Sequence, residues 1–464
     1  MESTCVSFLR AVRGILRSRQ ANGRKEVGWQ CDTGFPARAP RLTGWKACAT
    51  FSHRHCINRI TDSFDALASG QKRCRLTQRI GDLFGRVVCV SWSLLARCER
   101  LKTLIALGST FGEHAITAKR AFPLSKSRPA TPSSRPMSTV VTFGELMFRL
   151  TTPGHQRFSQ AAHFEITPGG AEANVAILIS RLGGHAEFVS RVPAHELGQR
   201  AIDELRRHGV GTSHIARGGE RIGIYFLEQG ASQRPGNVIY DRARSAITEV
   251  QPGDFGWPRI FTGASWFHWT GITPALSKSA AQVCEEACRA AKKRGITVSF
   301  DINFRAKLWS TKAAARALQP LMKYVDLCVA GADEARAILG ARGNSDETIA
   351  VDLVERFGFK TVAMTSRQSG TASATNCGAM LFTDGRAFHS QRHDITIVDR
   401  VGSGDAFTGA LIFSLMRGEA PQAAVNFAAA AGTLKHTIPG DYCLVSHAEI
   451  EALAAGGHGG RVQR

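Results

Sequence analysis

The chain has 464 residues, of which 43% are hydrophobic and 21% are charged, and it carries a formal net charge of +21 at pH 7. This composition is typical of a globular protein, and the length is sufficient for one large domain and a further segment. No run of 18 apolar residues occurs, so the sequence predicts no membrane-spanning helix.

The positive charge is concentrated in the first third of the chain. Residues 1–136 contain 24 Lys and Arg against 8 Asp and Glu, a balance of +16, whereas the remaining residues contain 35 against 30, a balance of +5. A strongly basic chain can bind nucleic acid, but here the charge does not extend over the part with regular periodicity. We therefore expect no nucleic-acid partner.

Residues 1–136 show no sustained helical or strand periodicity and end in the Pro- and Ser-rich stretch "FPLSKSRPATPSSRP" (122–136), which is typical of a linker. Three interpretations compete: a basic nucleic-acid-binding arm, an Arg-rich targeting peptide, and an extension without a folded function. We favour the third. It predicts a basic, Cys-rich extension over 1–136 that is disordered or not part of the native protein, followed by one domain over 137–464.

One cluster in the extension has residue types that bind metals. The stretch "CATFSHRHC" brings together Cys48, His53, His55 and Cys56, but the spacing matches no zinc pattern well, so we interpret it as chance. The five cysteines after residue 136 also lack metal or disulfide spacing, which is typical of reduced thiols in a cytoplasmic protein.

From Met137 onward, short apolar runs alternate with segments of helical periodicity. The run "STVVTFGELMFRL" (138–150) is predicted to be an apolar strand. Further strands are predicted at "AEFVSRV", "ASWFHW", "ITVSFDIN", "VDLCVAG" and "KTVAMTS", and helices at "GGAEANVAILISRLGG", "ELGQRAIDELRRHGV", "KSAAQVCEEACRAAKKRG" and after Gly404. This order predicts an α/β fold with a mainly parallel sheet and helices on both faces, in which ligands bind outside the carboxyl ends of the strands.

Residues 221–246 break the alternation. They are predicted to form two strands joined by a polar loop that contains Gly and Pro. Such a hairpin could be a lid over a site or an ordinary edge hairpin, and the pattern alone favours neither.

The stretch "DRVGSGDAFTGALIFSLM" (399–416) joins small residues to an apolar helix. Gly402, Ser403 and Gly404 lack bulk, so their backbone can approach a ligand, and the free N–H groups and dipole of the helix favour an anion. Asp405 lies in the first helical turn. A carboxylate beside a phosphate site suits a base that accepts a proton from an attacking hydroxyl. The alternative is that Asp405 only caps the helix.

A second glycine-rich stretch, "TPGGAEANVAILISRLGG" (167–184), places Gly169 and Gly170 before a helix that carries Asn174 in its first turns. The glycines could let a polar substrate contact the backbone. Alone, such a strand-to-helix turn is common and indicates little.

Together, the two stretches resemble the motifs of the ribokinase-like, or PfkB-type, carbohydrate kinases. The early Gly-Gly motif of that family matches Gly169, Gly170 and Asn174, and its late D-x-x-G-x-G-D-x-F motif matches Asp399, Gly402, Gly404, Asp405 and Phe407. The resemblance covers residues 137 to about 455. It implies a three-layer α/β/α sandwich with a mainly parallel central sheet and a small β lid at 221–246.

The resemblance also implies an ATP- and Mg²⁺-dependent phosphorylation of a sugar-like hydroxyl. Asp405 would be the general base, and the backbone amides of Gly402, Ser403 and Gly404 would form an anion hole for the γ-phosphoryl group. ATP would contact Asn303, Ser366, Arg367 and Gly370, together with Gly402 and Gly404.

Within the family, the chain is most similar to kinases of 2-keto-3-deoxygluconate, through "PGGAEANVA", "IYDRARSA", "FHWTGITPALS", "SFDINFRAKLW" and "HTIPGDYCLVS". An acid substrate needs a cation, which Arg242 and Arg305 could supply, since a guanidinium binds a carboxylate through two parallel hydrogen bonds. The alternative for each arginine is a surface charge or an ion pair at a sheet edge. By resemblance, Gly169, Gly170, Asn174, Tyr225, Tyr240 and Asp441 would complete the substrate site.

One position departs from the family pattern. Many relatives carry N-x-x-E after the strand that reads "DLCVAG" here, whereas this chain has Gly331 at the Asn position and keeps Glu334. The Mg²⁺–phosphate role of that pair is therefore in doubt, and Glu334 would act alone through water or only belong to a helix.

We expect a cytoplasmic enzyme that phosphorylates 2-keto-3-deoxygluconate at its 6-hydroxyl to give 2-keto-3-deoxy-6-phosphogluconate, with a possible homo-oligomer through the lid. One alternative is a kinase of a neutral sugar such as fructose. Another is a non-catalytic regulatory or nucleic-acid-binding protein on the same fold.

Deletion of residues 1–136 is predicted to leave folding and phosphotransfer activity intact, because the periodic segments and both glycine motifs begin after Met137. Thermal unfolding and ADP release by the two forms provide the test. An insoluble or inactive truncated chain would contradict the interpretation of the extension, and salt-sensitive nucleic-acid binding by the full chain alone would favour the regulatory alternative.

Overall fold

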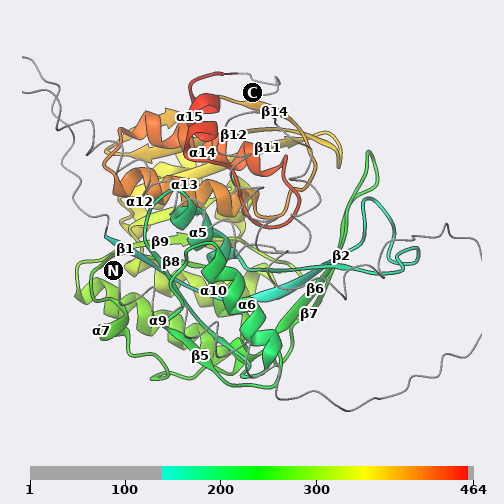
Figure 1. Cartoon of the computed structure of the whole chain (residues 1–464). Helices are drawn as coiled ribbons and strands as arrows, with labels where there is room; N and C mark the ends of the chain where they lie inside the picture. Colours follow the sequence, from blue (N-terminus) through cyan, green and yellow to red (C-terminus); the bar gives the residue numbers. More distant parts are fainter. Residues whose placement is uncertain (1–137, 458–464) are drawn as a thin grey trace, which may run out of the picture. The chain divides into compact units, whose positions relative to one another are not determined.

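The computed structural model describes residues 138–457 (Figure 1). The interpretations for the extension, including the cluster of Cys48, His53, His55 and Cys56, lie outside the described residues and stay predictions.

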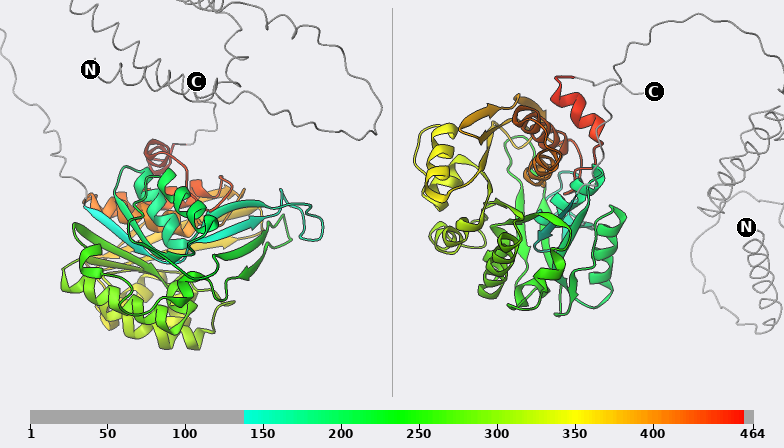
Figure 2. Two further views of the ribbon diagram at one scale, coloured as in Figure 1. Left: turned by 60° about the horizontal axis from the view of Figure 1, so that its bottom comes forward. Right: turned by 90° about the vertical axis from the view of Figure 1, so that its left-hand side faces the viewer.

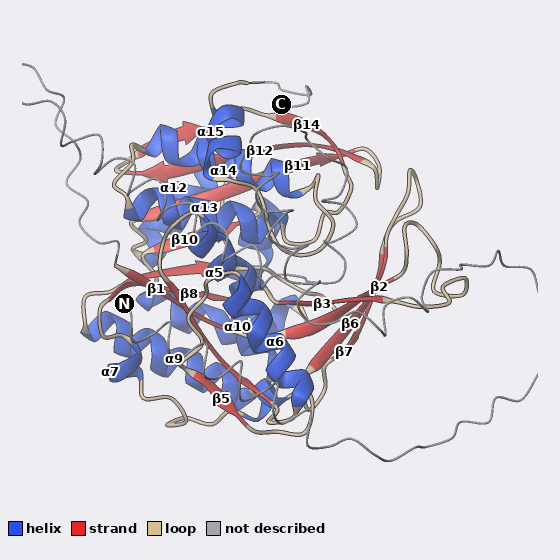
Figure 3. Cartoon of the chain, viewed as in Figure 1, coloured by secondary structure: helices blue, strands red, loops and turns tan. Residues whose placement is uncertain are grey.

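A ten-stranded sheet lies at the centre of the described part (Figures 1 and 3). Its order is β13-β12-β11-β10-β9-β8-β1-β4-β5, with β14 beside β12. The strands are β1 (Thr139–Phe143), β4 (Ala186–Val192), β5 (Ile215–Arg217), β8 (Ala264–Thr270), β9 (Thr297–Asp301), β10 (Leu327–Ala330), β11 (Thr361–Ser369), β12 (Ala374–Thr383), β13 (Arg386–His389) and β14 (His393–Thr396). From β11 to β5 all neighbours are parallel, as the alternation predicted.

Helices cover both faces of this sheet, and Figure 2 shows the resulting layers. One apolar core joins the sheet to α5 (Ala171–Arg181), α6 (Glu196–Arg207), α13 (Ser403–Met416), α14 (Pro421–Lys435) and α15 (His447–Ala454). The other joins it to α7 (Trp257–Ile260), α9 (Lys278–Lys293), α10 (Thr311–Leu318) and α12 (Asp346–Phe357). Two short helices, α8 (Ile272–Leu276) and α11 (Ala332–Glu334), follow strands β8 and β10. The predicted three-layer α/β/α sandwich is confirmed.

A second, four-stranded sheet extends away from the first and is called the lid here (Figures 1 and 3). Its order is β3-β2-β6-β7, with β2 (Met147–Thr151), β3 (Glu165–Gly169), β6 (Gly223–Glu228) and β7 (Asn237–Asp241). The hairpin predicted at 221–246 supplies only β6 and β7. The other two strands come from the start of the domain.

The run 138–150, predicted as one strand, is divided between the two sheets. β1 ends at Phe143 in the central sheet and β2 begins at Met147 in the lid. The division falls at Gly144, where a Cβ atom would lie 2.1 Å from the carboxylate of Glu172, so a larger residue would have to displace that side chain. Apolar periodicity predicts a strand but does not show to which sheet it belongs.

The sequence analysis did not predict the antiparallel edge formed by β12, β13 and β14. Within residues 138–457, no helix combines the length and apolar character needed to cross a membrane. The five cysteines of the described part are all free thiols, and four of them are buried.

Candidate active site

A cavity of about 730 Å³ lies where the carboxyl ends of β9, β10 and β11, the start of α13 and the inner face of the lid meet. This is the position expected for a ligand site in a parallel α/β sheet. Of the predicted site residues, it is lined by Asn174, Tyr225, Tyr240, Arg242, Asn303, Arg305, Glu334, Ser366, Arg367, Gly402, Ser403, Gly404, Asp405 and Asp441. Gly169, Gly170 and Gly370 are not part of this lining.

The loop before α13 has the geometry that its glycines predicted. Gly402 is the N-cap residue, and its φ of 80° lies in the left-handed region that favours glycine. A Cβ atom there would also lie 2.0 Å from the carbonyl oxygen of Asp441. The first N–H groups of a helix lack partners within it, and those of Gly404 and Asp405 have no acceptor among the described residues. The loop therefore offers free donors to an anion.

Asp405 is held by two asparagines from distant parts of the chain. Asn174 in α5 donates from Nδ2 to Oδ2 of Asp405 at 2.7 Å, and Asn303 donates to Oδ1 at 3.5 Å. Burial raises the pKa of Asp405 to about 6, although the bond from Asn174 and the charge of Arg305 oppose this shift. Asp405 is therefore an oriented carboxylate that is ionised near neutral pH, as a general base must be.

Asn303 adopts φ of 43°, a left-handed conformation that is strained for a residue with a side chain, although Asn tolerates it better than most. Its backbone N–H donates to Oδ1 of Asp301 at 3.0 Å, which compensates part of this strain. The turn directs its side chain to Asp405, whereas the sequence had placed it at the nucleotide.

Asp301, at the end of β9, is a cavity residue that the sequence reasoning missed. Burial, reinforced by the charges of Glu334 and Asp405, raises its pKa to about 8. Burial likewise raises the pKa of Glu334, and Arg305 opposes that shift. The only hint in the sequence was the position of Asp301 two residues before Asn303, at the carboxyl end of a predicted strand.

Arg305 lies in this acidic region without a counter-ion. Within residues 138–457 it forms no ion pair, and its one direct hydrogen bond runs from Nη1 to the carbonyl oxygen of Phe304 at 3.0 Å. Its charge lowers the pKa of the nearby carboxyls of Asp301, Glu334 and Asp405. A half-buried guanidinium without a carboxylate partner is available to an anionic ligand.

The second predicted arginine, Arg242, has a partner that the sequence did not reveal. Its Nη2 atom lies 2.6 Å from Oε2 of the buried Glu145, and its guanidinium stacks 4.7 Å from the ring centre of Tyr240. Ser245 donates to the other carboxylate oxygen of Glu145 at 2.8 Å. The Nε and Nη1 atoms of Arg242 have no partner among the described residues, so the side chain is fixed but still has free donors.

Asp441 and the early glycines pack together. Asp441 is 4% exposed and accepts from the hydroxyl of Tyr225 at 2.7 Å. A Cβ atom on Gly169 would lie 2.4 Å from its carboxylate, and one on Gly170 would lie 2.0 Å from the carbonyl oxygen of Glu145. Both glycines therefore permit close packing of the cavity wall, and their predicted contact with the substrate stays a prediction.

The predicted nucleotide residues lie beside the α13 loop. Nη2 of Arg367 is 3.4 Å from Oγ of Ser403, and Ser366 accepts from Arg392 at 2.9 Å. Gly370 lies at the turn between β11 and β12, in a separate hollow beneath the tip of the lid hairpin. Gly331 has room for a side chain, since a Cβ atom there would lie 3.8 Å from its nearest neighbour, the carboxylate of Glu334.

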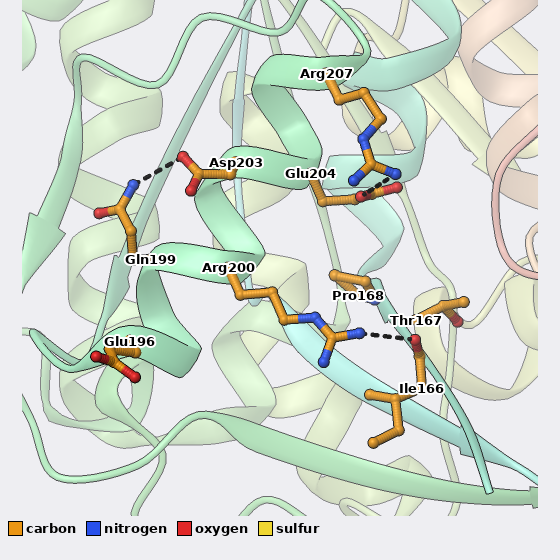
Figure 4. Close-up of a pocket in the computed structure, with 9 residues that line it drawn as sticks. All are labelled: Ile166, Thr167, Pro168, Glu196, Gln199, Arg200, Asp203, Glu204 and Arg207. Atoms are coloured by element: carbon orange, nitrogen blue, oxygen red, sulfur yellow. Dashed lines mark hydrogen bonds and ion pairs between the residues drawn. The ribbon is translucent and has the colours of Figure 1, made fainter. Parts of the chain in front are cut away.

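A further cavity of about 450 Å³ lies between α6 and the edge strand β3 of the lid (Figure 4). It contains none of the predicted site residues. Both of its arginines already have partners, Arg207 with Glu204 at 3.1 Å and Arg200 with the carbonyl oxygen of Ile166 at 3.4 Å. The convergent polar groups that mark a reaction centre lie in the larger cavity.

Comparisons with known proteins agree with this fold and cavity. Residues 137–444 match the sequence model of the pfkB family carbohydrate kinases. The chain is 38% identical to a 2-dehydro-3-deoxygalactonokinase of Haloferax volcanii, over 69% of this chain and 98% of the relative. It is 32% identical to a 2-dehydro-3-deoxygluconokinase of Thermoproteus tenax, over 68% and 94%.

The fold is also similar to solved structures. A crystal structure of 2-dehydro-3-deoxygluconokinase from Thermotoga maritima superposes with a TM-score of 0.68 at 47% identity, covering 69% of this chain and 98% of that one. These similarities define a phosphotransferase that acts on a hydroxyl group of a sugar. The chain belongs to the pfkB family of carbohydrate kinases.

Substitution of Asp405 by Asn is predicted to lower kcat by roughly a hundredfold to ten-thousandfold, because the amide keeps the shape but cannot accept the proton. Steady-state ADP release measures the effect, and an unchanged melting temperature serves as the control for folding. Turnover near that of the native enzyme would contradict the assignment of Asp405 as the base.

The pH dependence is predicted to follow the raised pKa of Asp405. Since the base acts only when ionised, kcat/KM is expected to rise with pH and to level off above an apparent pKa near 6. Asn174→Ala removes a hydrogen bond that favours the ionised form of Asp405. The rising limb of the plot of kcat/KM against pH is therefore expected to move to higher pH. A limb that stays in place or moves to lower pH in the variant would contradict the role of Asn174.

Proposed function

We propose that the protein transfers the γ-phosphoryl group of ATP to the 6-hydroxyl of a 2-keto-3-deoxy sugar acid. The observation that carries this proposal is the guanidinium of Arg305, which forms no ion pair within residues 138–457 and lies in the cavity that contains the oriented carboxylate of Asp405. The guanidinium of Arg305 would bind the carboxylate of the acceptor, and the carboxylate of Asp405 would accept the proton of its hydroxyl. The names of the relatives from Haloferax volcanii and Thermoproteus tenax support the same class of acceptor.

The two arginines have different electrostatic roles in this proposal. The charge of Arg242 is already compensated by Glu145 at 2.6 Å, so Arg242 contributes directed donors rather than net charge. Arg305 has no such partner among residues 138–457 and supplies the charge that an acidic acceptor requires. We therefore assign the larger share of the selectivity for an acid to Arg305.

The reaction follows from these positions. The Asp405 carboxylate accepts the proton of the acceptor hydroxyl as its oxygen forms a bond to the γ-phosphorus, and the bond from that phosphorus to the β-phosphate oxygen breaks to release ADP. The N–H groups at the start of α13 would bind the oxygens of the transferred phosphoryl group. Arg367, beside Ser403, would hold a nucleotide phosphate.

The cavity also fits a magnesium ion. Mg²⁺ binds through one or two carboxylates, waters and substrate phosphates, and Asp301 and Glu334 are two carboxyls close enough for the charge of Glu334 to raise the pKa of Asp301. We propose that they hold the ion, since Gly331 offers no side-chain oxygen at the usual position. The ion would neutralise charge on the nucleotide phosphates.

The configuration of the acceptor at C4 distinguishes two epimers. The relatives include a 2-dehydro-3-deoxygalactonokinase and a 2-dehydro-3-deoxygluconokinase, whose acceptors share the carboxylate and the terminal hydroxyl. Of the two we propose 2-keto-3-deoxygluconate, since 47% identity relates the chain to the gluconokinase from Thermotoga maritima. The alternative is a neutral acceptor, and a probable fructokinase of Arabidopsis thaliana is 28% identical.

We also propose a cytoplasmic location, which the five free cysteines of the described part support. A homo-oligomer through the lid is supported by two apolar residues on its outer strands, Ile166 at 44% and Ile239 at 48% exposure. The mass of the protein in solution, compared with that of an Ile239→Glu variant, tests this contact.

The acceptor is tested by measuring ADP release with Mg-ATP and 2-keto-3-deoxygluconate, 2-keto-3-deoxygalactonate, gluconate, ribose or fructose. Turnover with one or both keto-deoxy acids and none with fructose is the expected result. Turnover confined to fructose or ribose would overturn the sugar-acid proposal and leave the role of Asp405 intact.

Arg305→Met is predicted to raise KM for the sugar acid roughly 10- to 100-fold, the loss expected for a hydrogen bond to a charged group. The matched control is Arg316→Met, which removes the same charge from α10, away from the cavity. Equal KM values for the Arg305 variant and the native enzyme would refute the assigned role.

A further inference from the structure

A buried arginine connects the lid to the rest of the molecule. Arg149 is carried by lid strand β2 and is 1% exposed. Its Nη1 atom donates to Oδ1 of Asp441 at 2.8 Å, and its Nη2 atom forms an ion pair with Asp399. The side chain thus leaves its own sheet and pairs with two carboxylates that lie 250 and 292 residues further along the chain.

Asp399 holds the loop that precedes α13. It is the first residue of the D-x-x-G-x-G-D motif, and its Oδ1 atom accepts from the backbone N–H of Val401 at 3.0 Å. Its Oδ2 atom accepts from the N–H of Gly440 at 3.0 Å. The carboxylate therefore fixes the start of the loop whose N–H groups face the cavity.

Asp441 fixes the other side of the same loop. Its backbone carbonyl oxygen packs against Gly402, where a Cβ atom would come within 2.0 Å. Its carboxylate also accepts from the hydroxyl of Tyr225 in lid strand β6. Two lid strands, through Arg149 and Tyr225, therefore meet the α13 loop at Asp441.

The buried positive and negative charges around Asp399 and Asp441 are equal in number. Lys435 is fully buried and donates to the carbonyl oxygens of Ile438 at 3.0 Å and Asp399 at 3.4 Å. Together with Arg149 it supplies two positive charges against the two carboxylates. Removing one partner from a buried ion pair is strongly destabilising, because it leaves a charge without compensation in a medium of low polarity. The lid and the loop consequently cannot shift independently.

We propose that Arg149 is a positioning residue that couples the acceptor side of the cavity to the phosphoryl side. It is not among the residues that line the cavity, so it acts through Asp399, Asp441 and Tyr225. An acceptor that orders the lid then also orders the α13 loop, and a nucleotide at the loop orders the lid. The two ligands bind with positive coupling, and each raises the affinity of the other by the same factor.

This inference rests on the proposed binding of nucleotide at the loop and acceptor under the lid. It does not depend on which acceptor is used. The test therefore uses the acceptor that gives turnover in the panel above, so a failure of the sugar-acid proposal leaves the coupling measurable.

The test compares the Kd of the acceptor with and without a non-hydrolysable ATP analogue, in the full chain. The native protein is expected to bind the acceptor at least about fivefold more tightly when the analogue is present. In Arg149→Met this ratio is expected to fall to near one, and Arg149→Lys is expected to restore part of it. Arg221→Met is the matched control, because Arg221 pairs with Asp241 at an exposed edge of the lid and does not reach the loop.

Two outcomes would overturn the proposal: a native ratio near one, or a ratio in Arg149→Met equal to that of the native protein. If Arg149→Met does not fold, the double variant Arg149→Met/Asp399→Asn removes one charge of each sign and is measured instead. The ratio of the two Kd values is also expected to be near one in the double variant. A ratio equal to that of the native protein would overturn the proposal here as well.

Discussion

The geometry of the cavity depends on one hydrogen bond, from Asn174 to Asp405, between residues 231 positions apart. It exists because the N-terminal ends of α5 and α13 lie side by side at one edge of the sheet. Gly409 permits this approach, since even a Cβ atom there would lie 3.3 Å from the carbonyl oxygen of Val175. The partial positive charges of two helix ends therefore converge where a phosphate would carry negative charge. Burial at the same point raises the pKa of Asp405, so the position of this carboxylate and its pKa have one cause.

The layered fold was predictable because most of its strands are buried on both faces and read as short apolar runs bounded by glycine. The lid was not fully predictable. Its strand β2 follows β1 after only three residues, and nothing in the sequence shows that the two strands belong to different sheets. The edge strands β13 and β14 have only four residues each, which is too short for a clear apolar period.

The site was predictable where backbone geometry dictates the residue type. Glycines before a helix, with a carboxylate in its first turn, predict an anion site from the sequence alone. Asp405 lies in the first turn of α13, as this pattern predicted. The burial of charged side chains could not be predicted in the same way. Glu145 and Arg149 lie in an apolar run and would be taken as exposed positions, since their partners are distant in sequence and nothing local indicates them. Asp441 and Tyr225 were predicted to bind the substrate, which stays a prediction, but the hydrogen bond between them was not predicted.

The way in which the lid is assembled limits how it can be exchanged between such enzymes by protein engineering. Its four strands enter the sheet from two separate parts of the chain, and Arg149 and Tyr225 return from it into the interior to meet Asp399 and Asp441. The lid is therefore not a module that can be exchanged by splicing a single segment. A transplant intended to change the acceptor would have to bring both lid segments together with the two carboxylates near the other end of the domain. The outer lid strand β7 alternates exposed and half-buried residues and carries none of these partners, so its side chains can be changed without disturbing the buried charges.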